Sequence, residues 1–288
     1  MTEDTLVRAT NLVQEARYDT YEQIQQKAQL VRQIFAQREI KIRNGSALDQ
    51  VLRKADVLSK AWSAQGAVPD AAVFCEAAFV NRLADAVTAL PDEAGIKTAL
   101  ERMAGSIMQS DNRQQSQGKD SLWEVILLAE LRVRGLAAIA AEPDILLKIN
   151  GADYPIACKK IWSVDNMCKQ ISKGAQQVAP FNNGGIIALN LDDLVPPGHV
   201  VAQPTNVEAQ RHLALCNAAF IDSNKHTLRR AVMEGAFDGY LISTTAPAIM
   251  EDEATSFSLC TTSTLWYPAD APQERVERII AFAQAHIA

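Results

Sequence analysis

The dipeptide Asn150-Gly151 is the feature of this 288-residue sequence that most constrains its fold. It separates two short apolar runs, residues 144–149 and 154–161, and Asn-Gly in such a place is typical of the tight turn that joins antiparallel strands. A third short run, residues 136–141, lies just before them. The sequence therefore predicts three short strands, of which the last two form an antiparallel pair.

Helices are predicted on both sides of these strands. Ser121 can cap a helix that carries Glu124 three residues later, the arrangement known as a capping box, and this helix would end at Gly135. A second helix is expected over about residues 165–179, followed by a continuous apolar strand over 184–191. The order helix, three strands, helix, strand predicts an α/β fold with a mixed β-sheet flanked by helices.

Composition divides the chain into three expected regions. Residues 4–108 show helical spacing and almost no β-branched runs, which predicts a helical N-terminal domain over 1–108. Residues 109–120 are polar and without periodicity, so a linker or mobile loop is expected there. Residues 121–288 then form the α/β domain. Its C-terminal part is expected to add helices over 205–222, 225–235 and 271–287 and strands over 239–245 and 256–267.

Cysteine, histidine and charge patterns exclude several kinds of site. The five cysteines include no CxxC pair and the four histidines show no metal-ligand spacing, so neither a disulfide framework nor a zinc site is expected. The net charge of −6 argues against nucleic-acid binding by the whole surface and favours a local basic groove. Without a recognisable secretory signal or membrane-spanning apolar run, a cytoplasmic protein that does not enter a membrane is expected.

Charged residues around the predicted hairpin suit phosphodiester chemistry. Metal-dependent hydrolysis needs carboxylates that hold Mg²⁺ beside the phosphate and a cation that orients water or stabilises developing charge. Asp144 opens one strand, Lys159 lies late in the next, and Glu124 on the preceding helix offers another carboxylate. Side chains at i and i+2 of a strand share a face, so a second strand carboxylate is expected at position 157, where the sequence has Ala157.

Residues 119–192, about a quarter of the chain, resemble the PD-(D/E)XK nuclease superfamily in motif order and in element order. The matching positions are Glu124 for the helical acid, Pro143-Asp144 for the PD half, Ala157-Cys158-Lys159 for the acid-x-Lys half, and Gln177 for the polar residue on the following helix. The resemblance implies a restriction-endonuclease-like core, built αβββαβ, and cleavage of DNA, less often of RNA, with Mg²⁺ or Mn²⁺. The resemblance also suggests a biological role in defence against foreign DNA or in DNA repair.

The resemblance also implies roles for single residues. Asp144 and the residue at position 157 would bind the metal with help from Glu124, while Lys159 would orient water or stabilise charge. Ala157 has no ligand atom, so this chain is expected to be inactive or nearly so. We rank first a deliberate replacement of a natural glutamate, because Glu124, Asp144 and Lys159 are all intact.

Two alternatives to such a replacement stay open. In the first, another acid, Glu142 or Asp165, fills the gap that the alanine leaves. In the second, the chain is a natural pseudonuclease, a non-catalytic module that binds nucleic acid or a partner. A third interpretation concerns the whole chain. The protein would be an assembly component whose helices in residues 1–108 bind a second copy or another protein, and its nuclease domain would be vestigial.

The hairpin region and the helix after it carry more lysines than aspartates, although the whole chain has a negative net charge. Lys160, Lys169 and Lys173 are the expected nucleic-acid contacts, since a local row of cations can follow a phosphate backbone. Lys160 points to the strand face opposite Lys159 and is expected to be solvated. An ordinary exposed helix face accounts for Lys173 and Gln177 about equally well.

Overall fold

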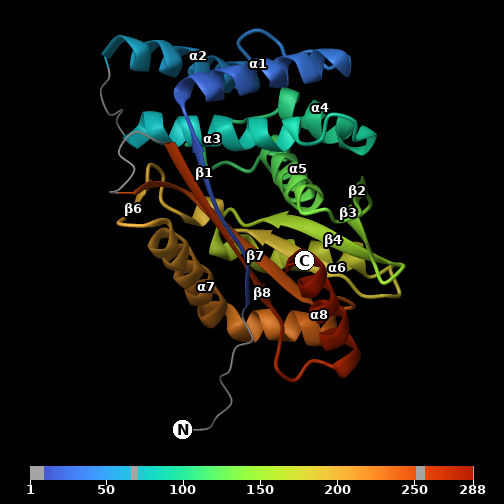
Figure 1. The fold of residues 1–288 in the computed structure, drawn as a ribbon. Coiled ribbons are helices and arrows are strands. Elements are labelled where there is room, and N and C mark those ends of the chain that lie inside the picture. Colours follow the sequence, from blue (N-terminus) through green and yellow to red (C-terminus); the bar gives the residue numbers. More distant parts are fainter. Residues whose placement is uncertain (1–9, 66–70, 251–256, 288) are drawn as a thin grey trace.

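The computed structural model describes residues 10–65, 71–250 and 257–287, which form a β-sheet with helices on both of its faces (Figure 1). The strands are β1 (Thr10–Asp19), β2 (Ala138–Ala141), β3 (Asp144–Ile149), β4 (Ala152–Lys160), β5 (Ile186–Asn190), β6 (Val201–Gln203), β7 (Gly239–Met250) and β8 (Phe257–Trp266). The helices are α1 (Tyr21–Gln37), α2 (Ala47–Gln65), α3 (Ala71–Thr88), α4 (Lys97–Gly105), α5 (Gln117–Val133), α6 (Met167–Val178), α7 (Asn206–Glu234) and α8 (Gln273–Ile287). Short 3₁₀ turns are η1 (Ala94–Ile96), η2 (Val164–Asn166) and η3 (Asp192–Leu194).

The sheet is mixed, as the sequence predicts. Its strands follow the order β1-β8-β7-β5-β4-β3-β2, and β6 pairs with β7 outside this path. The central pairs β4–β5 and β5–β7 are parallel, whereas β2, β3, β8 and β1 pair antiparallel on the two sides. Parallel neighbours need a crossover, and α6 and α7 supply the two crossovers here. The predicted α/β class and mixed sheet are therefore confirmed.

Each face of the sheet has its own buried apolar cluster. Helices α6 and α7 pack on one face, where Ile171 and Phe220 join Ile187 and Ile242 of the strands. Helix α5 covers the other face, where Trp123 and Leu127 join Ile145 and other strand residues. In Figure 1, α3 and α4 lie beside α5, and α1 and α2 form a further layer beyond them. No helix within the described ranges is long and apolar enough to cross a membrane.

The predicted hairpin is present with the expected turn. Asn150 and Gly151 both have positive φ, +51° and +80°, as the tight turn between right-handed twisted strands requires. The two strands pair antiparallel from Ile145 opposite Ile156 to Ile149 opposite Ala152. β4 thus begins two residues earlier than predicted, because the pairing continues up to the turn.

The N-terminal region is not helical throughout, so this part of the prediction is wrong. Residues 10–19 form β1, an edge strand that pairs antiparallel with β8. Their partner lies more than two hundred residues away in the sequence, and such non-local pairing overrides a weak local preference for helix. The first nine residues lie outside the described part of the chain.

Two further boundaries differ from the sequence prediction. The predicted linker 109–120 ends in the first turn of α5, where Gly118 and Lys119 are buried. The predicted helices 205–222 and 225–235 are one helix, α7, with no break between them. Asn224, at the expected break, donates a side-chain hydrogen bond to the Phe220 carbonyl (2.8 Å), which satisfies the amide without interrupting the helix.

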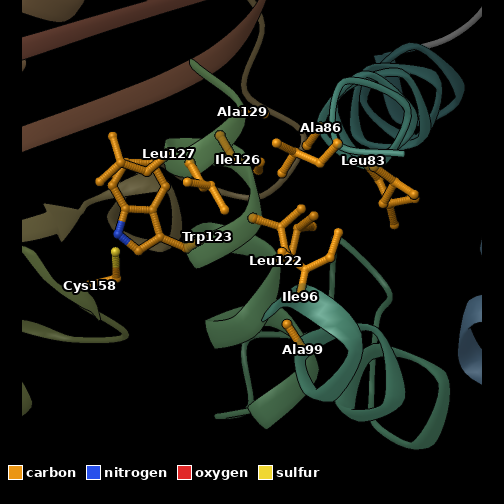
Figure 2. Packing of buried hydrophobic residues seen from close by; sticks show 14 of the residues in the cluster. Leu83, Ala86, Ile96, Ala99, Leu122, Trp123, Ile126, Leu127, Ala129 and Cys158 are labelled. Atoms are coloured by element: carbon orange, nitrogen blue, oxygen red, sulfur yellow. The ribbon is translucent and has the colours of Figure 1, made fainter. Parts of the chain in front are cut away.

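One buried cluster connects the N-terminal helices with the sheet. Figure 2 shows Leu83 and Ala86 of α3 and Ile96 and Ala99 near α4 packing towards Leu122, Ile126 and Ala129 of α5. Trp123, on the same helix, turns towards Cys158 of β4 and donates from its Nε1 to the Ala188 carbonyl (3.2 Å). The division into domains 1–108 and 121–288 stays a prediction, and the apolar contacts of α5 extend to both.

We expect Gly151→Ala to lower the free energy of unfolding by about 1 kcal/mol, because a left-handed backbone is unfavourable for a residue with a Cβ. Gly105→Ala is the matched control. A Cβ at either glycine would meet no atom within 4 Å, but only Gly151 has positive φ. Urea denaturation measures both variants, and equal stabilities would contradict the turn geometry.

Candidate functional site

The hairpin brings Asp144 and Lys159 together. The β3–β4 register pairs Ile145 with Ile156, so its continuation places Asp144 opposite Ala157, two residues before Lys159. The Asp144 Oδ2 accepts hydrogen bonds from the Cys158 backbone N–H (2.7 Å) and from the Lys159 Nζ (3.1 Å). Both ionic side chains are largely buried, at 12% and 11% exposed. Lys159 is therefore buried against an anion, the Asp144 carboxylate.

Glu124 reaches the same place from α5. This helix begins at Gln117 with Ser116 as its N-cap residue, so the predicted capping box of Ser121 and Glu124 is wrong. Ser121 instead lies buried inside the helix. Glu124 therefore has no capping role at the start of the helix. Together with Asp144 it lines one cavity of about 210 Å³ between α4, α5 and the β2–β3 connection.

The two carboxyl groups hold protons more tightly than free carboxyls do. Burial, and after it the negative charge of Asp144, raise the pKa of Glu124 to about 7 against the opposing effects of Arg102 and Lys159. Burial also raises the pKa of Asp144, against the opposing effects of the Lys159 ammonium and the Cys158 N–H. A partly protonated acid near neutral pH is the kind of group that general acid–base chemistry uses.

Ala157 leaves the set of metal ligands incomplete. Its side chain is fully buried and packs in the cluster on the α6 face with Ile161 and Ile187. Across the described ranges, no three His, Cys, Asp or Glu residues are arranged to hold a metal ion. Mg²⁺ prefers six oxygen ligands in near-octahedral geometry, which two carboxyl groups beside an ammonium do not offer. The residues present therefore do not fit a bound Mg²⁺.

The Lys159 ammonium supplies positive charge at this point. Its Nζ donates to the Cys158 carbonyl (2.6 Å) as well as to the Asp144 carboxylate (3.1 Å). An ionised carboxylate in a largely buried place is costly unless it is paired. Lys159 thus compensates Asp144 without any added cation.

Neither of the two acids suggested as substitutes completes the site. Glu142 lines the cavity shared by Glu124 and Asp144, but its side chain is exposed. Asp165 lies in the η2 turn, is exposed, and does not line this cavity.

Helix α6 places Gln177 next to the site. Its Nε2 lies 3.5 Å from the Pro143 carbonyl, a long contact, and its Oε1 is buried without a hydrogen-bond partner. Lys173 and Lys169 are exposed at successive i−4 positions from Gln177, so the three share one stripe of the helix. Gln170 of the same helix is buried.

Lys160 is not the solvated charge that the sequence suggests. It is 9% exposed, donates to the Asn190 Oδ1 (2.7 Å) and lies 2.8 Å from the Asp193 carboxylate. Lys160 is therefore not exposed as Lys169 and Lys173 of α6 are, and it does not join them in a row of surface cations.

Sequence reasoning missed the charged cluster around Lys160. Its other members are Arg82, Arg113, Lys119, Asp192 and Asp193. Arg113 and Lys119 lie within residues 109–120, which the sequence analysis interpreted as a linker, so they were not considered as site residues. The signal that was available is the pair of aspartates directly after a buried strand, at the carboxyl edge of a parallel sheet where ligands often bind.

Comparison of the chain with models of known families, with curated proteins and with solved structures finds no match. The resemblance to the PD-(D/E)XK superfamily accordingly stays a prediction.

We expect Glu124→Gln to stabilise the protein above pH 7 by on the order of 2 kcal/mol. The folded chain keeps a proton on Glu124 between its ordinary pKa of 4.5 and about 7, whereas the unfolded chain releases it, so stability falls as pH rises through this window. The gain of the variant should vanish below about pH 4.5, where both states are protonated.

Urea denaturation at pH 4, 6 and 8 measures this effect. Glu101→Gln, which removes an exposed carboxylate from α4, is the control. The same pH dependence in both variants would contradict the burial of a charged Glu124.

Proposed function

We propose that this chain has the scaffold of a metal-dependent nuclease that acts on DNA, with its metal site interrupted at Ala157. The observation that carries the proposal is the alignment across the hairpin. Asp144 lies opposite position 157, and Lys159, two residues further on, contacts its carboxylate at 3.1 Å. A single substitution at position 157 would complete the acid, acid and lysine set.

The order of elements supports the same proposal. α5, β2, β3, β4, α6 and β5 follow one another in the order αβββαβ, with β3 antiparallel and β5 parallel to β4. Glu124 on the first helix and Gln177 on the second both border the hairpin. This is the element order that the resemblance implies, and a restriction-endonuclease-like core is part of the proposal.

The chain's own residues suggest how such a site would act. Lys159 would stabilise negative charge on a phosphate oxygen or orient the attacking water. Glu124, with its pKa raised to about 7, would accept or donate a proton near neutral pH. With a carboxylate at position 157, Mg²⁺ or Mn²⁺ would supply Lewis-acid polarisation of the phosphate. In the present chain this contribution is missing, so we expect little or no cleavage.

The exposed stripe on α6 supports nucleic acid as the substrate. Lys169 and Lys173 lead along the helix surface towards Gln177 and the hairpin. Two cations beside the site suit a phosphate backbone that passes across it. We propose DNA rather than RNA because the resembling family cleaves DNA more often.

A second candidate function is binding without catalysis. The observation that favours it is the complete burial of Ala157 among apolar side chains. At this position alanine is an ordinary packing residue, so the fold does not require a bound metal there. Such a module would bind nucleic acid, or a protein or second copy through the helices of residues 1–108.

We expect Ala157→Glu to create Mg²⁺- or Mn²⁺-dependent cleavage of supercoiled or linear DNA. Ala157→Glu combined with Lys159→Met should not cleave. Without a divalent ion, Ala157→Glu should also melt several degrees lower than the parent chain, because it adds a buried carboxylate opposite Asp144. Mg²⁺ should restore much of this loss and leave the parent melting temperature unchanged.

Ala157→Gln is the matched control, since it has nearly the same shape but no charge. If Ala157→Glu gains no Mg²⁺-dependent stability over this control, the metal site is wrong. If it gains stability yet no variant cleaves, while all bind DNA, the scaffold is a binding module.

We expect the double variant Lys169→Gln/Lys173→Gln to bind DNA more weakly and to reduce the salt slope of the binding constant by about 2. The control is Lys60→Gln/Lys97→Gln, which removes the same charge from exposed positions on α2 and α4. Fluorescence anisotropy at several salt concentrations measures both, and equal slopes would rule out α6 as the DNA surface.

A further inference from the structure

A second cavity lies beside Lys160, on the α5 face of the sheet. It measures about 210 Å³ and is bounded by α3, α5, the end of β5 and the segment 192–199. Phe79, Leu122 and Ile126 form an apolar wall. This volume is room for a small ligand or one part of a larger one. We refer to it as the Lys119 cavity.

Lys119 lines this cavity without a carboxylate partner. It is 4% exposed, and its ammonium donates to the Asn112 backbone carbonyl and lies 5.4 Å from the centre of the Trp162 ring. In the ranges that the structure covers, no carboxylate lies within ion-pair distance of it. A buried charge of this kind is costly unless something compensates it. Burial accordingly lowers the pKa of Lys119 to about 8.

The other three lining cations have carboxylate partners. Asp192 pairs with Arg82, and Asp193 pairs with both Arg113 (2.5 Å) and Lys160 (2.8 Å). Among the described residues, these pairs leave Lys119 as the lining cation that has no carboxylate within ion-pair distance. At the rim, Asp111 is exposed and Glu76 pairs with Lys54.

Donor groups at the cavity are also unused. Arg82 Nη2 and Arg113 Nε are buried and have no hydrogen-bond partner. Buried guanidinium donors are normally satisfied, and a planar guanidinium is well suited to phosphate oxygens.

The position in the fold is one where ligands bind in α/β proteins. Lys160 ends β4 and Asn190 ends β5, and these parallel strands have their carboxyl ends at the same edge. In open α/β sheets, the carboxyl edge of parallel strands is the usual place for a ligand.

We propose that the Lys119 cavity binds a phosphomonoester dianion that carries a small apolar or planar group. The dianion, with a charge of about −2 near neutral pH, would compensate the unpaired Lys119 ammonium, and its oxygens would meet this ammonium and the free guanidinium donors. The attached group would lie against the Phe79 and Leu122 wall. A free mononucleotide and the phosphorylated end of a nucleic acid share this chemistry. The cavity does not involve Asp144 or position 157, so the inference stands apart from the proposed nuclease function.

The test measures binding by the full chain and by Lys119→Met. The probes are inorganic phosphate, deoxyadenosine monophosphate, deoxyadenosine, and a short DNA duplex with or without a 5′-phosphate. Calorimetry and melting temperature serve as readouts at constant ionic strength. Methionine keeps the apolar stem, so Lys119→Met should fold and melt at or above the parent temperature. Lys97→Met, at an exposed position on α4, is the control.

We expect the parent and Lys97→Met to bind the monophosphate at least tenfold more tightly than the nucleoside, and Lys119→Met to lose this difference. Selective binding of the free monophosphate, or of the phosphorylated duplex alone, supports the proposal and identifies the source. No phosphate-dependent binding by the parent overturns it. Equal phosphate-dependent binding by Lys119→Met overturns it as well.

Discussion

The pairing register of β3 and β4 is the constraint on which the candidate site depends. Side chains alternate between the faces of a strand, so a shift of one residue would exchange every side chain of β4 between the two faces. The turn at Asn150-Gly151 fixes this register because both residues accept positive φ. From it follow the position of Asp144 opposite Ala157, the contact with Lys159, and the burial of Ile156 towards α5.

Helix α5 adds the second organising element. Its apolar residues pack towards α3 and α4 on one side and towards the sheet on another. Its polar residues serve both charged regions: Lys119 lines one cavity and Glu124 lines the other. Asp120 lies between them and accepts a hydrogen bond from the Trp162 Nε1 (3.2 Å). The same helix therefore supports the core and positions groups in both cavities.

The sequence predicted the parts of the fold that depend on local signals. The hairpin, the strand 186–190 and the amphipathic helix after Lys160 all follow from turn chemistry and from the periodicity of apolar residues. β1 was missed because the described strand that pairs with it, β8, lies at the other end of the chain. The pairing of Asp144 with Lys159 follows from strand alternation and register. The Lys119 cavity could not be predicted, because its charges come from α3, α5 and the segment after β5, which only tertiary packing brings together.

Lys159 and Lys160 are neighbours in the sequence, yet their side chains lie on opposite faces of the sheet. The first contacts Asp144 on one face of the sheet, and the second contacts Asp193 in the Lys119 cavity on the other. Their separation depends only on the two-residue period of the strand. A substitution can therefore change either lysine independently. Insertion or deletion of one residue in β4 before the two lysines would instead move both side chains to the opposite face of the sheet. The length of this strand should therefore vary less than the lengths of the described loops.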